Sequence, residues 1–504
     1  MSAISPEITS KDRWRRFLHW EHLGLFIIVL VTLIFHFIAI ERPATIVWDE
    51  KWYVGDARSI ISGTGELRTE HPPLGKLFIA AGEYIFNGFK APEEDTGVLT
   101  QQSIYSYSSE NSSIIEVSDS TGFNAGDTIR IGTEQMNVTA INAVLDQITV
   151  ERGAGGSIPA FHDSLQPVYV YTDNAFGWRF FSIVFGTAGI VIVYFICRKL
   201  RLSPKATLLA TFLFAAEDMT FLHSGLALLD VYLVTFMLAA VWCYLDERYL
   251  WSGVLVALSA NCKLAGAFIL IALCLHWLVY RRTDWKRMFG LLAVAAVSFV
   301  CFLVFFDFFI KGGLENPVTR IHELLSGSLA NTFTDPKMSI SSRPWEWLYP
   351  QWLRPEYYSP FLVYSFNPQY ISFISSTIQI MTLPAMGYMT YRAVKGSRAA
   401  GLVLLWFLAT YLVWIPLDII TNRVTYVFYF LSTTPAVCIA IGMALGDSLD
   451  KLKARRLSLG GNTPWARTAY IAIGLYLLLH LAIFVVFNPA IPPIIKTWLP
   501  PFVS

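Results

Sequence analysis

The chain has 504 residues, of which 54% are hydrophobic and 15% are charged, and its formal net charge is +1. This composition is too apolar and too poor in charge for an ordinary soluble enzyme, so we predict a polytopic membrane protein and expect no nucleic-acid partner. The six cysteines fall in or beside apolar segments without a CxxC pattern, which indicates neither a disulfide scaffold nor a zinc module.

Apolar runs long enough for membrane spans recur along the chain, since a helix needs roughly 20 apolar residues to cross a bilayer. The first residues lack a small-residue cleavage site after a short apolar core, so we expect the first span to be an uncleaved anchor. The predicted spans are 22–41, 178–199, 206–222, 226–245, two short helices within 250–280, 288–310, 370–391, 399–417, 424–446 and 468–488.

Basic connectors between these runs decide the predicted orientation. They are Arg13, Arg15 and Arg16; Arg198, Lys199, Arg201 and Lys205; Arg281, Arg282, Lys286 and Arg287; Arg392, Lys395 and Arg398; and Lys451, Lys453, Arg455, Arg456 and Arg467. Placing all of them in the cytoplasm gives about eleven spans, with the N-terminus inside and the C-terminus outside. Two large loops, 42–177 and 311–369, then face outward.

The first outward loop changes character along its length. Residues 100–171 alternate apolar and polar side chains between turn signals, which predicts a small all-β insert, whereas 74–87 is typical of a helix lying at the membrane interface. We therefore expect five parts: 1–99 with the first span and first loop, 100–171 as the β insert, 172–310 with spans two to seven, 311–369 as an aromatic loop, and 370–504 with spans eight to eleven.

Ionisable residues gather at the outer ends of the predicted spans. Each costs about 2.5 to 3.5 kcal/mol at mid-bilayer, so such a distribution is informative. The group contains Asp49, Glu50, Arg179, Glu217, Asp218, His223, Asp230, Lys263, Asp418 and Arg423. Cations here could hold a lipid phosphate while a carboxylate takes a proton from an acceptor hydroxyl. The alternative is that the arginines and lysines are snorkelling anchors and that Asp49 and Glu50 end a solvated helix.

Two further motifs have both a structural and a functional interpretation. The stretch HPPLGK, residues 71–76, is a turn in which Pro73 can open a helix. The stretch SSRPWEWLYPQWLRPEYYSP, residues 341–360, fits an interfacial aromatic belt, and its Trp345 and Trp347 are also candidates for stacking on a sugar.

Taken together, these stretches resemble the protein O-mannosyltransferase family, which transfers mannose from dolichyl phosphate and has the GT-C membrane glycosyltransferase fold. The matching pieces are DE at 49–50, HPPLGK at 71–76, WRFFSIVFGTAGIVIVY at 178–194, LALLD at 226–230, NCKLAGAF at 261–268, SSRPWEWLYPQWLRPEYY at 341–358 and NRVTYVFYFLSTTPAV at 422–437. They occur in order over nearly the whole chain outside the β insert.

The resemblance implies an inverting transfer of mannose from dolichyl-phosphate-mannose to Ser or Thr hydroxyls of secreted or surface proteins, without a cofactor. It implies that Asp49 is the general base, that Glu50 shapes the acceptor site, and that Arg179 and Lys263 bind the lipid phosphate; Arg423 joins them through its place at the same membrane face. Supporting roles around the acceptor and sugar are expected for Glu70, His71, Lys76, Asp218, His223, Asp230, Trp345 and Trp347. Pairing with a second copy, as family members often do, is left open.

The sequence also departs from the family pattern. Loop 311–369 is too short for the β-trefoil domain of eukaryotic members, and Gly225 stands where the eukaryotic pattern has an arginine. These departures resemble an archaeal or bacterial member in the plasma membrane, with its active site facing outward.

Three other functions stay open on the sequence. One is a related transferase that modifies a lipid or glycan, like aminoarabinose transferases, for which Asp49, Glu70 and His71 could ligate a divalent metal. The second is a transporter, which the absence of related halves and midplane polar groups disfavours. The third is a surface-binding protein whose β insert carries the function.

Overall fold

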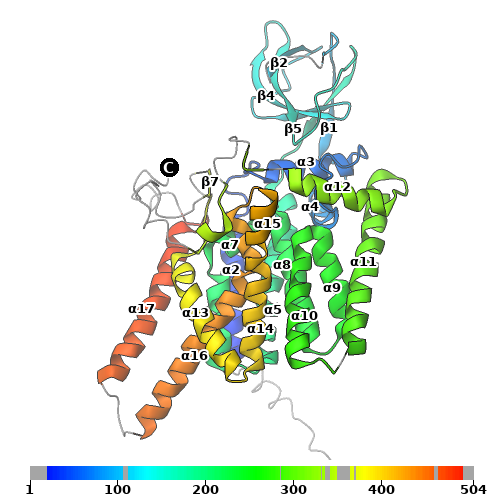
Figure 1. Cartoon of the computed structure of the whole chain (residues 1–504). Helices are drawn as coiled ribbons and strands as arrows, with labels where there is room; N and C mark the ends of the chain where they lie inside the picture. Colours follow the sequence, from blue (N-terminus) through cyan, green and yellow to red (C-terminus); the bar gives the residue numbers. More distant parts are fainter. Residues whose placement is uncertain are drawn as a thin grey trace, which may run out of the picture.

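The computed structural model contains a helical bundle and a small β-sheet domain that stands on one end of it (Figure 1). The structure describes residues 20–105, 112–283, 285–330, 332–334, 341–348, 364–367, 370–458 and 464–491.

The bundle is built from helices that lie on both sides of the β-sheet domain in the sequence. They are α2 (Trp20–Ala39), α5 (Ala175–Lys199), α6 (Pro204–Ala215), α7 (Asp218–Gly225), α8 (Leu229–Leu245), α9 (Tyr249–Cys262), η1 (Leu264–Phe268), α10 (Ile269–Tyr280), α11 (Trp285–Lys311), α13 (Ser376–Val394), α14 (Arg398–Phe407), η4 (Leu408–Leu412), α15 (Trp414–Thr421), η5 (Val427–Ser432), α16 (Thr434–Ser458) and α17 (Pro464–Phe487). Helix α8 packs on α5 and α9, α9 packs on α11, and α6 packs on α16.

Small residues allow the closest of these contacts. Gly442 and Gly446 of α16 face Ala206 and Ala210 of α6, and a Cβ atom added to Gly442 would lie 2.7 Å from the Cβ of Ala210. Helices in a lipid environment gain stability from such close packing, because lipid tails remove the hydrophobic drive for association.

Helix length supports a multi-pass membrane protein without fixing the number of spans. Five described helices are long and apolar enough to cross a membrane: α2, α5, α11, the run Arg398–Thr421 and α17; the pair α7 and α8, bent by 111°, adds a sixth if it counts as one span. Helices α6, α9 and the run Leu264–Tyr280 are apolar but shorter. The total of about eleven spans stays a prediction.

Several predicted spans are interrupted where polar groups sit. The span expected at 206–222 is wrong as a continuous helix, because α6 ends at Ala215 and the Glu217 side chain caps α7 by accepting a hydrogen bond from the Thr220 amide. The span expected at 424–446 begins instead as the 3-10 helix η5, and α16 then continues to Ser458. These breaks place polar side chains at one end of the bundle.

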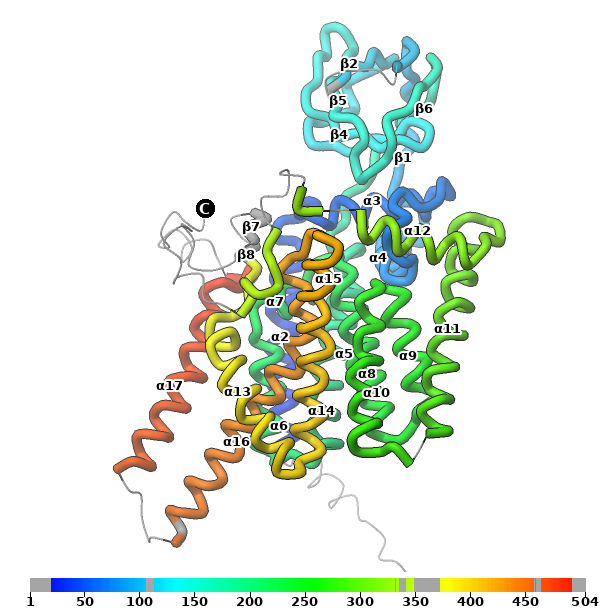
Figure 2. Tube along the Cα trace, in the orientation of Figure 1, coloured from blue at the N-terminus to red at the C-terminus, as the bar shows by residue number. Residues whose placement is uncertain are grey.

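Three helices outside the bundle lie at that same end, beneath the β-sheet domain (Figure 2). They are α3 (Glu50–Ile61), α4 (Leu74–Phe86) and α12 (Pro317–Ala330). Helix α4 forms where the interfacial helix was expected at 74–87, and Pro73 precedes its first turn. Of the aromatic loop 311–369, the described part after α12 includes the short helix η2 (Pro344–Glu346) and the hairpin β7 (Tyr364–Asn367) and β8 (Tyr370–Ser372); the rest of motif 341–358 lies outside the described residues.

The β-sheet domain is one antiparallel six-stranded sheet with the strand order β1-β6-β3-β4-β5-β2. Its strands are β1 (Glu93–Leu99), β2 (Ser112–Glu116), β3 (Thr128–Ile131), β4 (Glu134–Asn142), β5 (Gln147–Ala154) and β6 (Pro167–Tyr171), so it starts before the predicted boundary at residue 100. Alternate side chains on one face form its core, including Ile129, Ile131, Met136, Val138 and Val150.

The domain is also fixed to α3 by direct contact. The Gln135 side-chain amide donates a hydrogen bond of 3.0 Å to the Gly55 carbonyl. At the same place Gly55 and Gly155 meet backbone to backbone, since a Cβ on Gly55 would lie 2.6 Å from the Gly155 Cα. Only glycine permits so close an approach, and it holds the sheet directly over α3.

Candidate active site

Asp49 lies at the N-terminus of α3, and its carboxylate does not cap the helix. It occupies the capping position, yet its side chain makes no capping hydrogen bond, and it is partly buried. The preceding residue, Trp48, has a φ of +48°, in the left-handed region that non-glycine residues rarely adopt, and its ring packs edge-on against Phe428 at 5.5 Å between centroids. The backbone at this turn is thus held in a costly conformation by packing, which is common at functional sites.

The surroundings of Asp49 suit a proton acceptor. Burial raises the pKa of its carboxyl to about 6, while the positive charges of Lys263 and Arg68 oppose that rise. A carboxylate with such a pKa is still largely ionised at neutral pH and is a stronger base than a solvated aspartate.

Glu50, next to Asp49, points the other way, into a fully buried ion pair with Arg179. The two nitrogens Nε and Nη2 of Arg179 donate to the Glu50 carboxylate at 2.8 and 2.6 Å, and the backbone amides of Val47 and Ala227 donate to it at 2.9 Å each. Arg179 also donates to the carbonyls of Ile40, Pro43 and Thr45.

This arrangement corrects the expectation that Arg179 binds the lipid phosphate and that Glu50 shapes the acceptor site. Both side chains are fully buried, and every N–H direction of the guanidinium is taken by a protein oxygen. Glu50 and Arg179 instead join the turn 47–50 to α5 and to the break before α8, and so they fix the turn that carries Asp49.

Lys76 is likewise a structural residue in this geometry, not part of an acceptor or sugar site. It is fully buried, and its ammonium group pairs with Asp56 at 2.9 Å, with Glu66 at 2.5 Å, and with the Arg68 carbonyl. Arg320 of α12 completes the network through Glu66 at 2.9 Å and the Thr69 carbonyl at 2.6 Å. These contacts clamp the loop 62–73, which carries the His-Pro-Pro motif, between α3, α4 and α12.

Lys263 lies at the break between α9 and η1, where the backbone is extended. Its ammonium group donates to both carboxylate oxygens of Asp230 on α8, at 2.9 and 3.0 Å, and lies 5.1 Å from the ring centres of Phe428 and Tyr429. Lys263 and Asp230 therefore lie together as an ion pair beside two aromatic rings.

A cavity of about 420 Å³ opens beside Lys263. Its walls are mostly apolar and come from η1, α12 and the α14–α15 run; its polar residues include His71, Lys263, Ser328, Thr421 and Arg423. The cavity thus joins a long apolar wall to a cationic end, which is the shape that a lipid with a charged head requires.

Arg423 contributes the second cation of that cavity. The only side-chain hydrogen bond of its guanidinium within the described part of the chain is a long one, 3.5 Å from Nη2 to the Tyr429 hydroxyl. Its backbone lies beside the described part of the aromatic motif, since Ser342 and Thr425 exchange hydrogen bonds of 2.9 and 2.7 Å. Most of its donors are available to a bound anion.

His71 faces the same cavity from the clamped loop, and its ring centre lies 6.0 Å from that of Tyr53. Burial, together with the charges of Lys263, Lys76 and Arg68, holds the pKa of His71 well below its usual value. The imidazole is therefore neutral at pH 7 and can donate or accept a hydrogen bond without adding charge.

Of the remaining predicted residues, some lie near Asp49 and the cavity, and others make structural contacts elsewhere in the bundle. Glu70 accepts from Arg68 at 2.5 Å, and His223 is buried with its ring 5.7 Å from Phe428, so both lie near the site. Asp218 instead accepts from the Phe373 amide at 3.3 Å. Trp347 is fully buried with its indole bound to Ser342, so sugar stacking is wrong for this residue, whereas Trp345 is 43% exposed.

Sequence reasoning missed three residues of the site. Arg68 lies close enough to Asp49 to lower its pKa, Tyr53 lies one helical turn after Asp49, and Tyr429 contacts both Lys263 and Arg423. Arg68 had a signal, because it stands between two glutamates in the loop that leads to His71. Tyr53 and Tyr429 had none that separates them from other aromatic residues.

A metal centre is not assembled among the described residues. No group of three or more His, Cys, Asp and Glu side chains within them has a geometry suited to holding a metal ion. Asp49, Glu70 and His71, the ligands considered for such a centre, therefore do not form one here.

Sequence and structure comparisons give the site a context. The family described as dolichyl-phosphate-mannose-protein mannosyltransferase matches residues 159–317. A polyprenol-phosphate-mannose–protein mannosyltransferase of Mycolicibacterium smegmatis is 24% identical over 364 residues, which are 56% of this chain and 69% of that protein. The chain is therefore similar to this mannosyltransferase family over part of its length. It is a glycosyltransferase, and the resemblance read from the sequence is confirmed.

Two further similarities extend this result. The S. cerevisiae protein O-mannosyltransferase complex, solved with its sugar donor, matches with a TM-score of 0.63 and 11% identity, over 95% of this chain and 92% of that one, which shows the GT-C fold. An undecaprenyl phosphate-α-4-amino-4-deoxy-L-arabinose arabinosyl transferase of Pseudomonas aeruginosa is 28% identical over 146 residues, 26% of each chain.

Proposed function

We propose that this mannosyltransferase-family protein transfers mannose from a polyprenyl (dolichyl) phosphate donor to Ser or Thr hydroxyls of proteins at the outer membrane face, with Asp49 as the general base. The observation that carries the proposal is that Lys263 and Arg423 line one apolar-walled cavity, while Lys263 also lies close enough to Asp49 to lower the pKa of its carboxyl. The relatives named for polyprenol-phosphate-mannose support the donor class.

The cavity supplies what a lipid-linked sugar donor needs. Leu264, Phe268, Leu417 and Ile420 line its apolar part, where a polyprenyl chain would lie. Lys263 and Arg423 stand at its charged end, where their N–H groups would hold the phosphate and stabilise the charge that it gains as the leaving group.

The chemistry needs one base and this electrostatic clamp. The acceptor oxygen attacks C1 of mannose as the bond between C1 and the phosphate oxygen breaks, and the lipid phosphate leaves with the electron pair. The hydroxyl proton passes to the Asp49 carboxylate, whose pKa is raised to about 6 by burial. The neutral His71 and the Tyr53 hydroxyl are placed to orient the reacting groups.

A transfer assay tests the proposal. The purified chain in detergent would be mixed with dolichyl-phosphate-mannose and a Thr-containing peptide, and products read by mass spectrometry. We expect wild type to add one hexose per modified residue and Asp49→Asn to lose about 100- to 10,000-fold in rate, as is typical for a missing general base. Glu94→Gln, which neutralises an exposed carboxylate of the β-sheet domain outside both cavities, is the matched control. A hexose added equally fast by Asp49→Asn would contradict the role of Asp49.

A second candidate is a transferase that modifies a lipid or glycan, which the Pseudomonas aeruginosa similarity favours. The same assay distinguishes the two functions when an anionic lipid acceptor replaces the peptide. Transfer to the lipid and none to any peptide would select this candidate. Measuring each reaction with and without a chelator would also reveal a divalent metal requirement.

A further inference from the structure

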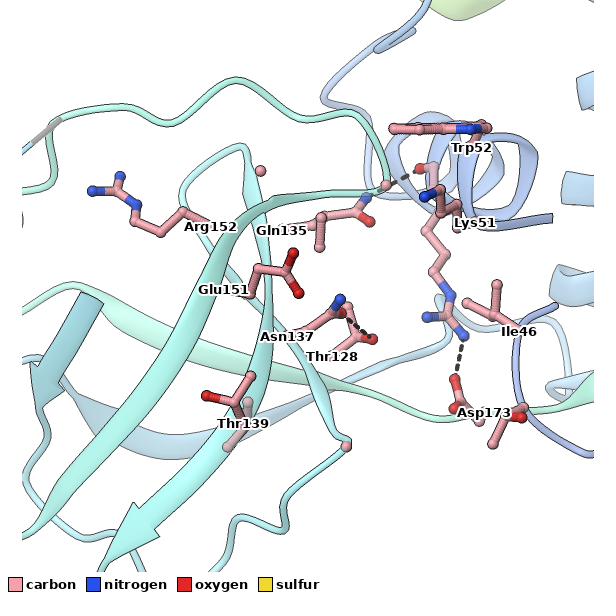
Figure 3. A pocket seen from close by; sticks show the side chains of 18 residues that line it. Ile46, Lys51, Trp52, Thr128, Gln135, Asn137, Thr139, Glu151, Arg152 and Asp173 are labelled. Atoms are coloured by element: carbon pink, nitrogen blue, oxygen red, sulfur yellow. Dashed lines mark hydrogen bonds and ion pairs between the residues drawn. The ribbon is translucent and has the colours of Figure 1, made fainter. Parts of the chain in front are cut away.

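A second cavity, of about 520 Å³, lies between the β-sheet domain and α3 (Figure 3). One wall is the sheet and the other is α3 with the turn that precedes it, including Thr45 and Ile46. Its volume falls within the range of about 300 to 1,000 Å³ that is usual for sites of bound ligands. It is separate from the apolar-walled cavity beside Lys263, which shares no lining residue with it.

The sheet presents a row of hydrogen-bonding side chains to this cavity. Thr128, Asn137 and Glu151 are in register across β3, β4 and β5, and Gln135 and Thr139 lie two residues to either side of Asn137. The register of β4 shifts beside Gln135 and at Thr139, and all five residues line the cavity that faces α3. Figure 3 shows Gln135, Asn137 and Glu151 extending from the sheet toward the helix.

The opposite wall is one face of α3. Lys51, Gly55 and Arg58 line it with helical spacing, and Arg58 is neutralised by Glu83 and Asp173, each at 2.8 Å. Lys51 is exposed, as is Glu151 across the cavity, and neither forms an ion pair within the described part of the chain. The cavity therefore has one available cation and one available anion on facing walls.

The cavity is lined by residues that flank Asp49, the proposed general base, in the sequence. Asp49 immediately precedes α3, so the wall residue Lys51 follows it by two positions and Ile46 precedes it by three. A polypeptide whose hydroxyl reaches Asp49 has flanking residues that must continue past this end of α3. The gap between α3 and the sheet opens beside this end of α3, because Thr45, Ile46 and Lys51 line it.

The chemistry of the walls favours a polypeptide over a sugar. Protein sites for sugars use a free aromatic face, but the aromatic residue of this cavity, Trp52, is covered: Lys51 and Arg68 lie 4.5 Å from its ring centre, and a Cβ on Gly156 would be 3.2 Å from its ring. The Thr128 and Thr139 hydroxyls donate to the Asn137 Oδ1 atom and the Thr149 carbonyl, so their oxygens remain as acceptors. The Asn137 amide nitrogen and the second N–H of the Gln135 amide remain as donors. Main-chain N–H and C=O groups of an extended chain need both kinds of partner.

We propose that this cavity binds the extended acceptor polypeptide beside the hydroxyl residue that is modified, and that Glu151 and Lys51 select the charges of its flanking residues. The proposal rests on the proposed function, because it identifies the occupant as the acceptor. The contacts between Gly55 and both Gln135 and Gly155 hold the two walls together, so the site exists before the peptide arrives.

Peptide binding without donor tests this inference apart from the transfer reaction. The full chain in detergent would be titrated against fluorescent Thr-containing peptides whose flanks are either lysines or glutamates, and fluorescence anisotropy recorded. We expect Glu151→Lys to weaken binding of the lysine-flanked peptide about tenfold and to strengthen that of the glutamate-flanked one. Glu94→Lys is the matched control, since Glu94 is also an exposed carboxylate on this sheet but does not line the cavity.

Each outcome is decisive. Equal effects of Glu151→Lys and Glu94→Lys, or no change in either, would overturn the inference while leaving the transfer reaction intact. A mannose oligosaccharide that displaces the peptide from wild type but not from Glu151→Lys would also overturn it, because the cavity would then hold a glycan. An exchange of peptide preference in a protein that fails to transfer mannose would support the cavity as a peptide site and reject the proposed function instead.

Discussion

Lys263 and Asp230 form a two-oxygen ion pair, at 2.9 and 3.0 Å, beside the rings of Phe428 and Tyr429 at the apolar-walled cavity. The aspartate fixes the position of the ammonium group and balances its charge. An arriving phosphate would then meet an oriented donor whose charge is already partly balanced, which favours reversible over tight binding.

We predict that replacing Lys263 weakens donor binding even when its partner is also removed. Lys263→Met alone leaves Asp230 uncompensated, so the donor KM should rise by about 10- to 100-fold. The double variant Lys263→Met with Asp230→Asn removes that penalty. Steady-state kinetics with varied donor should still show a raised KM in the double variant; a return to the wild-type value would mean that Lys263 serves only to neutralise Asp230.

A second prediction concerns Arg423, whose guanidinium has few protein partners in the described structure. Arg423→Gln should raise the donor KM about tenfold with little change in thermal stability, because it removes a charged contact to substrate and breaks no buried ion pair. The control is Lys395→Gln, an exposed cation after α13 that does not line the cavity. Identical kinetics for Arg423→Gln and wild type would remove Arg423 from the donor site.

The pH dependence of transfer should report Asp49. A base must be ionised to accept the proton, and burial raises the pKa of Asp49 to about 6. Plots of log kcat/KM for the peptide should therefore be flat above that pH and fall by about one unit per pH unit below it. Because Lys263 lowers the pKa of Asp49, Lys263→Met should move the acid limb to higher pH. An acid limb near pH 4 in both proteins would show that Asp49 is solvated.

Arg179 should affect stability more than donor binding. Its removal leaves the buried Glu50 carboxylate without a counter-charge, which typically costs about 3 to 5 kcal/mol. We expect Arg179→Met to lower the unfolding temperature in detergent strongly. Arg198→Met is the matched control on the same helix, because Arg198 is 43% exposed and its ion pair with Glu21 should contribute little. Equal stability of the two variants, with a raised donor KM for Arg179→Met, would restore the phosphate-binding role.

The sequence alone was sufficient for the class of protein, and it also nominated Asp49, Lys263 and Arg423 as candidate site residues. Long apolar runs indicate a membrane protein, because exposing so many apolar residues to water is costly. Charged residues at the ends of the predicted spans are rare against this apolar background and are therefore informative. The ordered motifs then pointed to the mannosyltransferase family, which the comparisons confirm.

Only the tertiary structure distinguished residues that face a cavity from residues that hold the walls. Glu50 and Arg179 belong to the motifs that predicted the site, yet they form an ion pair with each other although 129 positions separate them in the sequence. Lys76 likewise forms ion pairs with Asp56 and Glu66. Which partner neutralises a buried charge depends on the packing of distant helices, so no local pattern contains it. The same holds for the cavity under the sheet, whose facing walls meet only because Gly55 and Gly155 allow two backbones to touch.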